Sequence, residues 1–270
     1  MEIEPEIDEN LVCLDWYNSD LNLRIHDDLM VASPFSREGW GYCYGGARAT
    51  YGVRTGKVWY EVKYVDVNDT KVEREKTTFD LRVGWSTDNS SLMLGESETS
   101  WAYSSAEGKM AHNSNFEEYG EKITKGDVIG AFLDIGEDEV SMTFTKNGED
   151  QGDAYQIKRA EFPDAAIFPH VLSKNIKFQV NFGVDAKGKD IDDFKEKLDG
   201  DYVKMAKVEA KERGVPRIVS RADCEMIMMV GLPGCGKTTW VDKHVAENPD
   251  KNYNIISTND MFKKMTVRQF

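Results

Sequence analysis

The sequence lacks the features that mark membrane-spanning, secreted and zinc-binding chains. It has no apolar run of about 18 residues, so we expect no membrane span. Its first ten residues, MEIEPEIDEN, are acidic and hold no apolar stretch, which argues against a secretory signal. No C-x-x-C pair and no metal-ligand spacing occurs among its cysteines and histidines, which are Cys13, Cys43, Cys224, Cys235, His26, His112, His170 and His244. This pattern predicts an intracellular protein in a reducing setting, with structural or surface histidines.

The sequence also lacks a surplus of positive charge. Its net charge is −14 over 270 residues, and only eight basic and six acidic residues lie from Arg217 onward. The first 216 residues therefore hold 26 basic and 42 acidic residues, a net charge of −16. A surface this acidic repels phosphate backbones and attracts cationic groups. On charge alone, the first 216 residues favour a protein or basic-peptide partner over a nucleic-acid groove.

Residues 11–184, which follow an acidic tail at 1–10, carry the period of β-strands. Every second residue from Val58 to Tyr64 is apolar in KVWYEVKYV, and the same alternation recurs from Val140 to Phe144 and from Ile176 to Phe182. Asn147-Gly148 comes shortly after the segment from Val140 to Phe144 and predicts a tight hairpin there, because both residues tolerate positive φ. Many short strands without a long helical pattern predict a mainly β fold, an antiparallel β-sandwich.

Five of the six tryptophans fall in this β region: Trp16, Trp40, Trp59, Trp85 and Trp101. We expect most of them to anchor the core or its loops, because aromatic side chains dominate core burial. Lining a peptide pocket is the alternative role for one or two of them.

Residues 185–221 are highly charged and poor in large apolar side chains. This composition predicts a solvated linker. Within it we expect short helices near Ile191–Leu198 and Val203–Lys211, and no helix past Val215-Pro216.

The octet GLPGCGKT at 231–238 fits the phosphate-binding pattern G-x-x-x-x-G-K-[ST] at every required position. The apolar run EMIMMV before it predicts a buried parallel strand, and TTWVDKHVAE after it predicts a helix that Asn248-Pro249 ends. NYNII predicts a second buried strand, and the polar residues that follow predict the cap of a helix from Met261. Residues 222–270 are thus expected to form part of an α/β P-loop domain.

The motif assigns a role to each of its residues. Glycines let backbone N–H groups turn toward phosphate oxygens, Lys237 reaches the β- and γ-phosphates, and Thr238 or Thr239 meets Mg²⁺ or the α-phosphate. Cys235, at a helix start, is expected to be a tolerated small residue, with a stabilised thiolate as the alternative. The expected cofactor is ATP or GTP with Mg²⁺, the metal being held by Thr238. The predicted phosphate-binding residues are Gly231, Gly234, Cys235, Gly236, Lys237, Thr238 and Thr239.

Several blocks of the sequence resemble a SPRY domain, in the order in which that domain carries them. They are GARATYGVRTGKVWYEVKY, LRVGWST, SWAYSS, GDVIGAFLD, MTFTKNG and IFPHVLSKNIKFQVNFG, within about residues 40–183. The leading segment ENLVCLDWYNSDLNLRI, the charged linker, GLPGCGKTTWVDKH and IISTNDMFKKM extend the likeness to almost the whole chain. In this arrangement the chain resembles the heterogeneous nuclear ribonucleoprotein U (scaffold attachment factor A) family.

The resemblance implies a nuclear, RNA- and chromatin-associated scaffold or adaptor. Its SPRY module would bind proteins, and its P-loop domain would be similar to polynucleotide kinases. Family members usually also carry an N-terminal SAP segment and a C-terminal Arg-Gly-Gly-rich tail. This sequence shows neither, so we expect a fragment or a truncated product in which direct RNA binding is largely missing.

The same resemblance leaves two other functions open. An ATP-dependent polynucleotide or nucleoside kinase would need a base just after the second strand, and that position falls on Asn259, which is a poor proton acceptor. Asp260 lies one residue away, and the later segments that phosphoryl transfer requires are not in the sequence. A SPRY substrate-recognition module of a ubiquitin ligase has less support, because zinc spacing and coiled-coil heptads are absent. We therefore expect no catalytic residue, and a protein that is not an enzyme.

Overall fold

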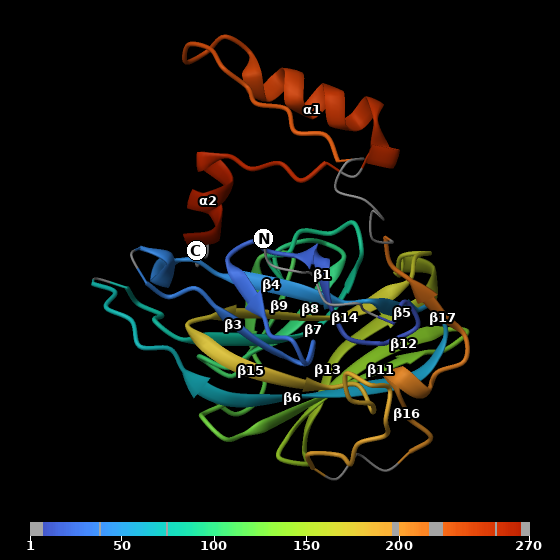
Figure 1. Cartoon of the computed structure of the whole chain (residues 1–270). Helices are drawn as coiled ribbons and strands as arrows, with labels where there is room; N and C mark the ends of the chain where they lie inside the picture. The colour runs from blue at the N-terminus through green and yellow to red at the C-terminus, as the bar shows by residue number, and fades with distance from the viewer. Residues whose placement is uncertain are drawn as a thin grey trace. The chain divides into compact units, whose positions relative to one another are not determined.

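The computed structural model describes residues 8–37, 39–73, 75–195, 200–215, 224–251 and 253–265 (Figure 1). It divides into two compact units, one of Met1–Val215 with Lys264–Phe270 and one of Pro216–Lys263. No helix among the described residues is long and apolar enough to cross a membrane. Nor do the described histidines, cysteines and carboxylates gather into a group that could hold a metal ion.

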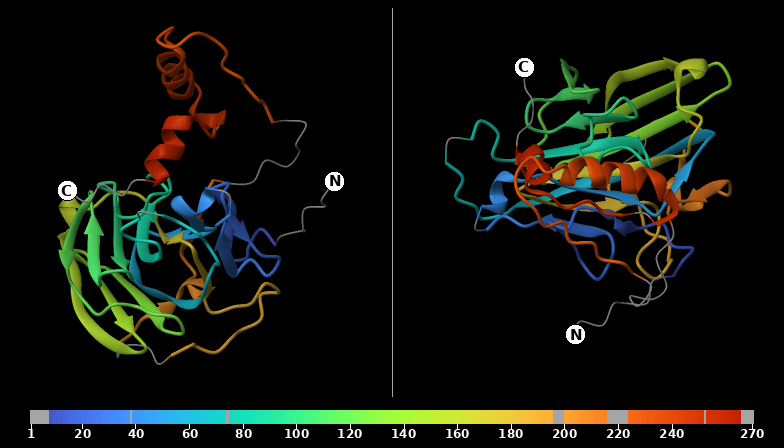
Figure 2. Two further views of the ribbon diagram at one scale, coloured as in Figure 1. Left: turned by 90° about the vertical axis from the view of Figure 1, so that its left-hand side faces the viewer. Right: turned by 90° about the horizontal axis from the view of Figure 1, so that it is seen from above.

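The first unit is a sandwich of two antiparallel sheets, whose layers are seen side-on in Figure 2. The first sheet runs in the order β1 (Leu14–Ser19), β4 (Gly45–Ala49), β14 (Ile167–Lys174), β7 (Asp80–Thr87), β8 (Ser100–Ser104), β9 (Lys109–His112) and β10 (Asn115–Glu118). Two short strands extend it, β5 (Tyr51–Val53) on β14 and β17 (Lys211–Arg213) on β5.

The second sheet forms the other layer. Its order is β13 (Glu149–Lys158), β12 (Glu139–Lys146), β11 (Val128–Ile135), β6 (Gly56–Val67), β15 (Ile176–Asn181), β3 (Val31–Pro34) and β2 (Leu23–Ile25), with β16 (Val203–Lys204) parallel to β6. Short 3-10 turns lie at Trp40–Tyr42, Arg159–Glu161 and Met205–Lys207. The predicted mainly β, antiparallel architecture is confirmed.

The core lies between the sheets and follows the alternation read from the sequence. Val58, Tyr60 and Val62 on β6 are all buried, and they stand opposite core residues of β11 in register. Burying side chains of this size contributes about 1.5–3 kcal/mol each to folding. The Tyr60 hydroxyl keeps a partner inside the core, donating to the carbonyl oxygen of Gly84 at 2.6 Å. A polar group is thus buried without losing its hydrogen bond.

The predicted hairpin at Asn147-Gly148 joins β12 to β13. Asn147 has φ 54° and Gly148 has φ 87°, so both central residues occupy the left-handed region. This backbone matches the twist of the flanking strands. The Asn147 side chain also receives the N–H of Val128 at 3.0 Å, which ties the hairpin to β11.

The helices predicted within the charged segment are not present. Residues 191–195 and 201–202 form neither helix nor strand, whereas Val203–Lys204 and Lys211–Arg213 are strands. The rest of the first predicted helix, 196–198, lies outside the described residues. The physical reason is burial: Met205 is fully inside the core and Lys204 nearly so. Residues 200–213 therefore pack on the sandwich as a strap.

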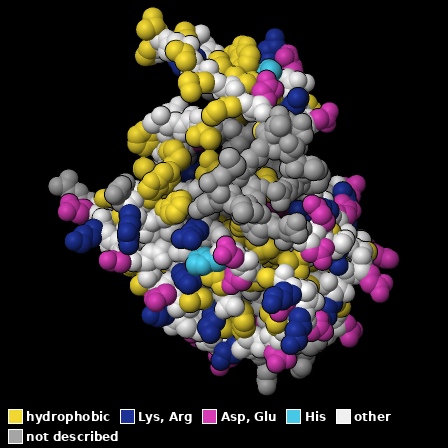
Figure 3. All heavy atoms as spheres, viewed as in Figure 1, with side chains coloured by type: hydrophobic (Ala, Val, Ile, Leu, Met, Phe, Trp, Pro, Cys, Tyr) yellow, Lys and Arg dark blue, Asp and Glu magenta, His cyan; other side chains and the backbone are white. Residues whose placement is uncertain are grey.

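The second unit contains the first helix predicted after residue 236 and most of the second, which begins three residues before the predicted Met261. Helix α1 (Lys237–Glu247) ends at Asn248, and α2 (Thr258–Met265) begins after Ser257. The two buried strands predicted around it do not form: 224–230 and 253–256 have no strand assignment. A strand requires a neighbour to receive its backbone hydrogen bonds, and the described part of this unit supplies none. Its apolar side chains stay exposed, as the yellow groups on this unit show in Figure 3.

Candidate phosphate-binding loop and sandwich pocket

The loop before α1 has the backbone that its glycines permit. Gly234 has φ 78° and Gly236 has φ 86°, conformations that side chains with a Cβ adopt at a cost. Gly231 lies so close to Cys235 that a Cβ added there would stand 2.7 Å from the Cys235 sulfur. The three glycines thus allow a compact loop that turns directly into a helix.

The N–H groups in the first turn of α1 lie outside the hydrogen-bond pattern of the helix. The first helical bond runs from the Trp240 N–H to the Gly236 carbonyl oxygen at 3.0 Å, and no side chain caps the helix. The N–H groups of Lys237, Thr238 and Thr239 have no assigned acceptor among the described residues. Free N–H groups and the positive end of the helix dipole together suit an anion.

Lys237 curls back over the loop. Its ammonium group donates to the carbonyl oxygens of Gly231 and Leu232, each at 2.8 Å, and lies 3.7 Å from the Cys235 sulfur. Its charge therefore stands at the loop itself rather than in solvent. All seven predicted phosphate-binding residues lie in this one loop and helix start, and the exposed hydroxyls of Thr238 and Thr239 are within its first turn. This donor set fits the phosphate groups of a nucleotide and a Mg²⁺ ion.

The carboxylate nearest the position of a kinase base is engaged in capping. Ser257 donates its hydroxyl to Asp260 at 2.6 Å, and the Asp260 N–H returns a bond to the Ser257 oxygen at 3.2 Å. Ser257 thus caps the start of α2 by accepting the Asp260 N–H with its side-chain oxygen. Lys263 adds an ion pair with Asp260 at 3.3 Å. Asp260 thus stabilises the start of α2, and Asn259 beside it carries no carboxylate.

An aromatic chain that the sequence reasoning missed holds the second unit together. The Trp240 and His244 rings stack at 4.6 Å between centroids, and His244 also meets the Tyr253 ring at 5.3 Å. The Tyr253 hydroxyl donates to Glu225 at 2.8 Å, which raises the pKa of Tyr253. The signal available in the sequence was the spacing of Trp240 and His244, four residues apart on one helix face.

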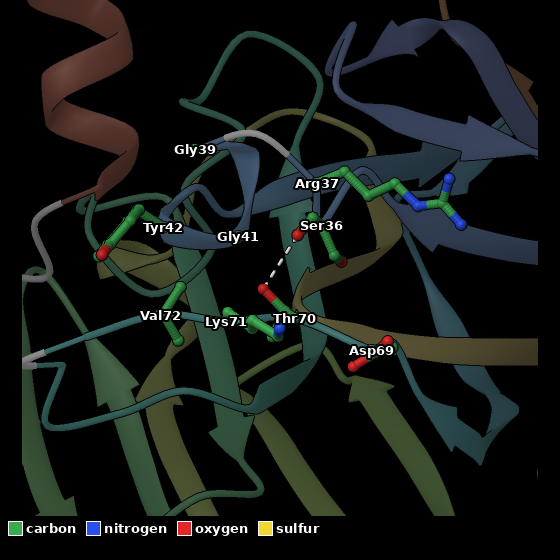
Figure 4. A pocket seen from close by; sticks show the side chains of 9 residues that line it. All are labelled: Ser36, Arg37, Gly39, Gly41, Tyr42, Asp69, Thr70, Lys71 and Val72. Carbon is green, nitrogen blue, oxygen red and sulfur yellow. Dashed lines mark hydrogen bonds between the residues drawn. The ribbon is translucent and has the colours of Figure 1, made fainter.

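The sandwich has a pocket of about 320 Å³ between the loop after β3 and the segment after β6 (Figure 4). Hydrogen bonds pin its two walls: Thr70 donates to the Ser36 carbonyl oxygen at 2.9 Å, and the Tyr42 hydroxyl accepts from the N–H of Glu73 at 3.1 Å. Gly41 is needed at the floor, because an added Cβ would collide with Thr70. The pocket is therefore preformed.

Trp40, between two pocket glycines in sequence, is exposed and meets Phe35 edge-on at 6.4 Å. The other four tryptophans of the β region are buried or half-buried, as expected of core anchors. Trp40 is therefore not a core anchor, and its side chain is not among those that line this pocket.

Comparison with known proteins shows which families the two parts of the chain resemble. The SPRY domain family matches residues 57–185, and the AAA domain family matches residues 226–270. The chain therefore carries a SPRY domain, followed in the sequence by a segment that matches the AAA domain family. Its close homologues are heterogeneous nuclear ribonucleoprotein U-like protein 2 from Homo sapiens and from Mus musculus, each 37% identical, over 98% and 97% of this chain. The family resemblance seen in the sequence is confirmed.

Two further similarities cover shorter parts of the chain. The ATP-dependent RNA helicase DDX1 of Xenopus laevis is 38% identical over 138 residues, which is 51% of this chain and 17% of that protein. The crystal structure of the SPRY domain of human HERC1 aligns with a TM-score of 0.47 at 19% identity, covering 62% of this chain and 96% of that one. The chain spans about a third of the length of the ribonucleoprotein U-like relatives, 35% and 34%.

Proposed function

We propose that this protein is a nuclear scaffold or adaptor of ribonucleoprotein assemblies. Its sandwich would bind partner proteins, and its P-loop segment would bind ATP or GTP with Mg²⁺ without transferring a phosphoryl group. The observation that carries the nucleotide part is the loop itself, in which free N–H groups at the start of α1 and the Lys237 ammonium group converge. RNA association and nuclear location are supported by the names of the homologues.

The arrangement around α2 favours binding over catalysis. A general base must reach the attacking hydroxyl with a free carboxylate or imidazole. Asn259 offers neither, and Asp260 is occupied by Ser257 and Lys263. Binding requires only the loop and the helix start, which are both formed.

The nucleotide site is tested by titrating the 270-residue chain with a fluorescent ATP analogue and Mg²⁺. Lys237→Ala should weaken binding at least about tenfold, because charge-assisted hydrogen bonds to phosphate are worth about 1.5–3 kcal/mol. Lys243→Ala is the matched control, since Lys243 lies on the same helix and is exposed, paired only with Glu247 at 3.7 Å. Equal affinities for Lys237→Ala and the unaltered chain would refute the proposed site.

A polynucleotide or nucleoside kinase is the second candidate, favoured by the presence of the P-loop alone. It predicts transfer of the γ-phosphate to a 5′-hydroxyl oligonucleotide or a nucleoside, and the loss of that transfer in Lys237→Ala. Our proposal predicts none, with Asn259→Asp also inactive, because phosphoryl transfer needs positioning and charge stabilisation by several groups, which one added carboxylate does not supply. Transfer that depends on Lys237 would establish the kinase in place of the scaffold.

A further inference from the structure

Strand β13 is a long open edge of the sandwich. It spans ten residues, Glu149–Lys158, and among the described strands it pairs with β12 alone. Its other side therefore presents backbone N–H and C=O groups to which another strand could add. The left view of Figure 2 shows yellow-green β13 near the green strands of the opposite sheet, and Tyr155 bridges them by donating to Ala102 at 2.9 Å.

This side of the molecule is strongly acidic. Strand β10, residues 119–121 and β13 together hold six acidic residues and one basic residue. Lysines of neighbouring strands pair with two of the six, Lys109 with Glu118 at 3.6 Å and Lys146 with Glu121 at 2.7 Å. Among the described residues no lysine or arginine forms an ion pair with the three exposed carboxylates of β13, which are Glu149, Asp150 and Asp153.

Two of these carboxylates point away from the core. The register sets Asp150 opposite Thr145 and Asp153 opposite Thr143. Thr143 is paired in turn with Phe132 of β11. Phe132 lies on the opposite face of the sheet from its neighbours Ala131 and Leu133, which belong to the core between the sheets. A bulge separates the pair, since Gly152 has φ 88° between them. A strand laid along β13 would therefore place alternate side chains beside Asp150 and Asp153.

The field of the two carboxylates extends over their surroundings. Burial raises the pKa of Tyr119, and Asp150 and Asp153 raise it further. The same two residues, with Asp134, also raise the pKa of Tyr202, again mainly through burial. A cation placed beside Asp150 and Asp153 would be attracted by these two carboxylates.

We propose that β13 receives an extended basic segment of a partner protein, which adds as a strand and sets lysine or arginine at alternate positions beside Asp150 and Asp153. Cross-strand pairs of opposite charge stabilise such an addition, and main-chain hydrogen bonds supply the rest of its affinity. A second copy of this chain does not suit the edge, because it would bring Asp150 and Asp153 against the same acidic strand. The inference rests on the proposed role of the sandwich as a protein-binding module.

The test uses the 270-residue chain and a fluorescein-labelled octapeptide of alternating lysine and valine. Binding is expected, and Asp150→Lys with Asp153→Lys should weaken it about tenfold or more, as two attractive cross-strand pairs become repulsive. The control is Asp27→Lys with Glu137→Lys, an equal change of net charge at exposed sites on other loops, with an effect of about threefold or less. Circular dichroism confirms that both variants keep their fold.

A second peptide separates strand addition from charge attraction alone. It has the same sequence with alternate backbone nitrogens methylated on one edge, which removes the hydrogen bonds of that edge and keeps every charge. Strand addition predicts a loss of about tenfold or more with the methylated edge toward β13. No binding of the first peptide, equal losses in the two double variants, or unchanged binding of the methylated peptide would each overturn the proposal. None of these outcomes bears on the nucleotide titration, so a failure here is distinguishable from a failure of the P-loop site.

Discussion

Lys204 lies almost wholly inside the protein, with its ammonium group between carboxylates and an indole ring. It is 2.7 Å from Glu61 and 3.1 Å from Asp193, and it stands 3.8 Å from the centroid of Trp59. Glu61 is buried as well, and it also accepts the N–H groups of Phe194 and Lys195 at 2.9 and 2.8 Å. A cation that is paired, hydrogen-bonded and over an aromatic face can be buried without a prohibitive desolvation cost.

Removing that ammonium group should destabilise the sandwich. Lys204→Ala leaves Glu61 buried with its charge uncompensated, and we expect a loss of about 3 kcal/mol in the free energy of unfolding. Urea unfolding followed by circular dichroism measures it. Lys207→Ala serves as the control, because its pair with Asp190 is half-exposed and should contribute less than about 1 kcal/mol. A similar small effect at both positions would show that Lys204 does not hold the strap.

His170 makes the stability of the sandwich depend on pH on the acid side. It is fully buried, with Nδ1 2.9 Å from the Ser86 hydroxyl, and burial and then Arg48 hold its pKa well below 6.5. The unfolded chain takes up a proton below about pH 6.5 and the folded chain does not, so stability should fall as pH decreases, by up to about 1.4 kcal/mol per pH unit. His170→Gln should show a shallower slope between about pH 6.5 and 5 than the unaltered chain. Identical slopes would contradict this assignment.

The four cysteines should divide into two classes of reactivity. Cys13 and Cys43 are buried, and burial raises the pKa of both thiols, that of Cys13 to about 12. Cys224 and Cys235 are exposed. A thiol reagent near pH 8 should therefore label two cysteines in the native chain and four after unfolding.

Mg²⁺ and ATP should slow the labelling of Cys235 and leave the labelling rate of Cys224 unchanged. Equal slowing at both cysteines would argue against nucleotide in the loop.

At the scale of elements, the two units differ in how their extended segments are paired. Strands β6 and β11 are hydrogen-bonded on both sides within a sheet, whereas 226–230 and 253–256 have no neighbouring strand among the described residues. Backbone amides in paired central strands open only when much of the domain unfolds, while unpaired amides exchange readily.

The amide hydrogen-exchange rates of the paired strands and of the unpaired segments should therefore differ strongly. Amides of β6 and β11 should be protected by several orders of magnitude more than those of 226–230, with α1 between them. Mass spectrometry of the whole chain after timed exchange gives the comparison within one sample. Protection of 226–230 equal to that of β6 would contradict the unpaired state of this segment.

The elements that were predictable from sequence are those whose signals are local. Alternation from Val58 to Tyr64 reports which side of one strand is buried, and Asn147-Gly148 encodes a turn in two residues. The strap was not predictable, because the burial of Lys204 depends on Glu61, 143 positions earlier in the chain. The strand predicted from the apolar run at 226–230 is absent for a related reason. A strand needs a neighbouring strand, and no local sequence pattern reports whether one is present. The glycine turn and the helix start at 234–237 were readable because their geometry depends on consecutive residues, whereas phosphate binding by this loop stays a prediction.

At the scale of the whole molecule, an acidic sandwich and a phosphate-binding loop stand on one chain. The region before Arg217, which holds the sandwich, carries a net charge of −16, whereas the loop brings backbone N–H groups and Lys237 together locally. Under the proposed function, the two units would recognise ligands of opposite charge. This division agrees with our proposal of an interaction protein whose P-loop segment carries nucleotide.

The most direct test of that account is to measure the fate of bound nucleotide. The chain is incubated with ATP and Mg²⁺, separated from free nucleotide by gel filtration, and the nucleotide that remains with the protein is identified by chromatography. We predict that unaltered ATP co-elutes with the chain and that Lys237→Ala elutes without it. Recovery of ADP in a Lys237-dependent manner, or no nucleotide on the unaltered chain at concentrations that saturate its titration, would contradict the account.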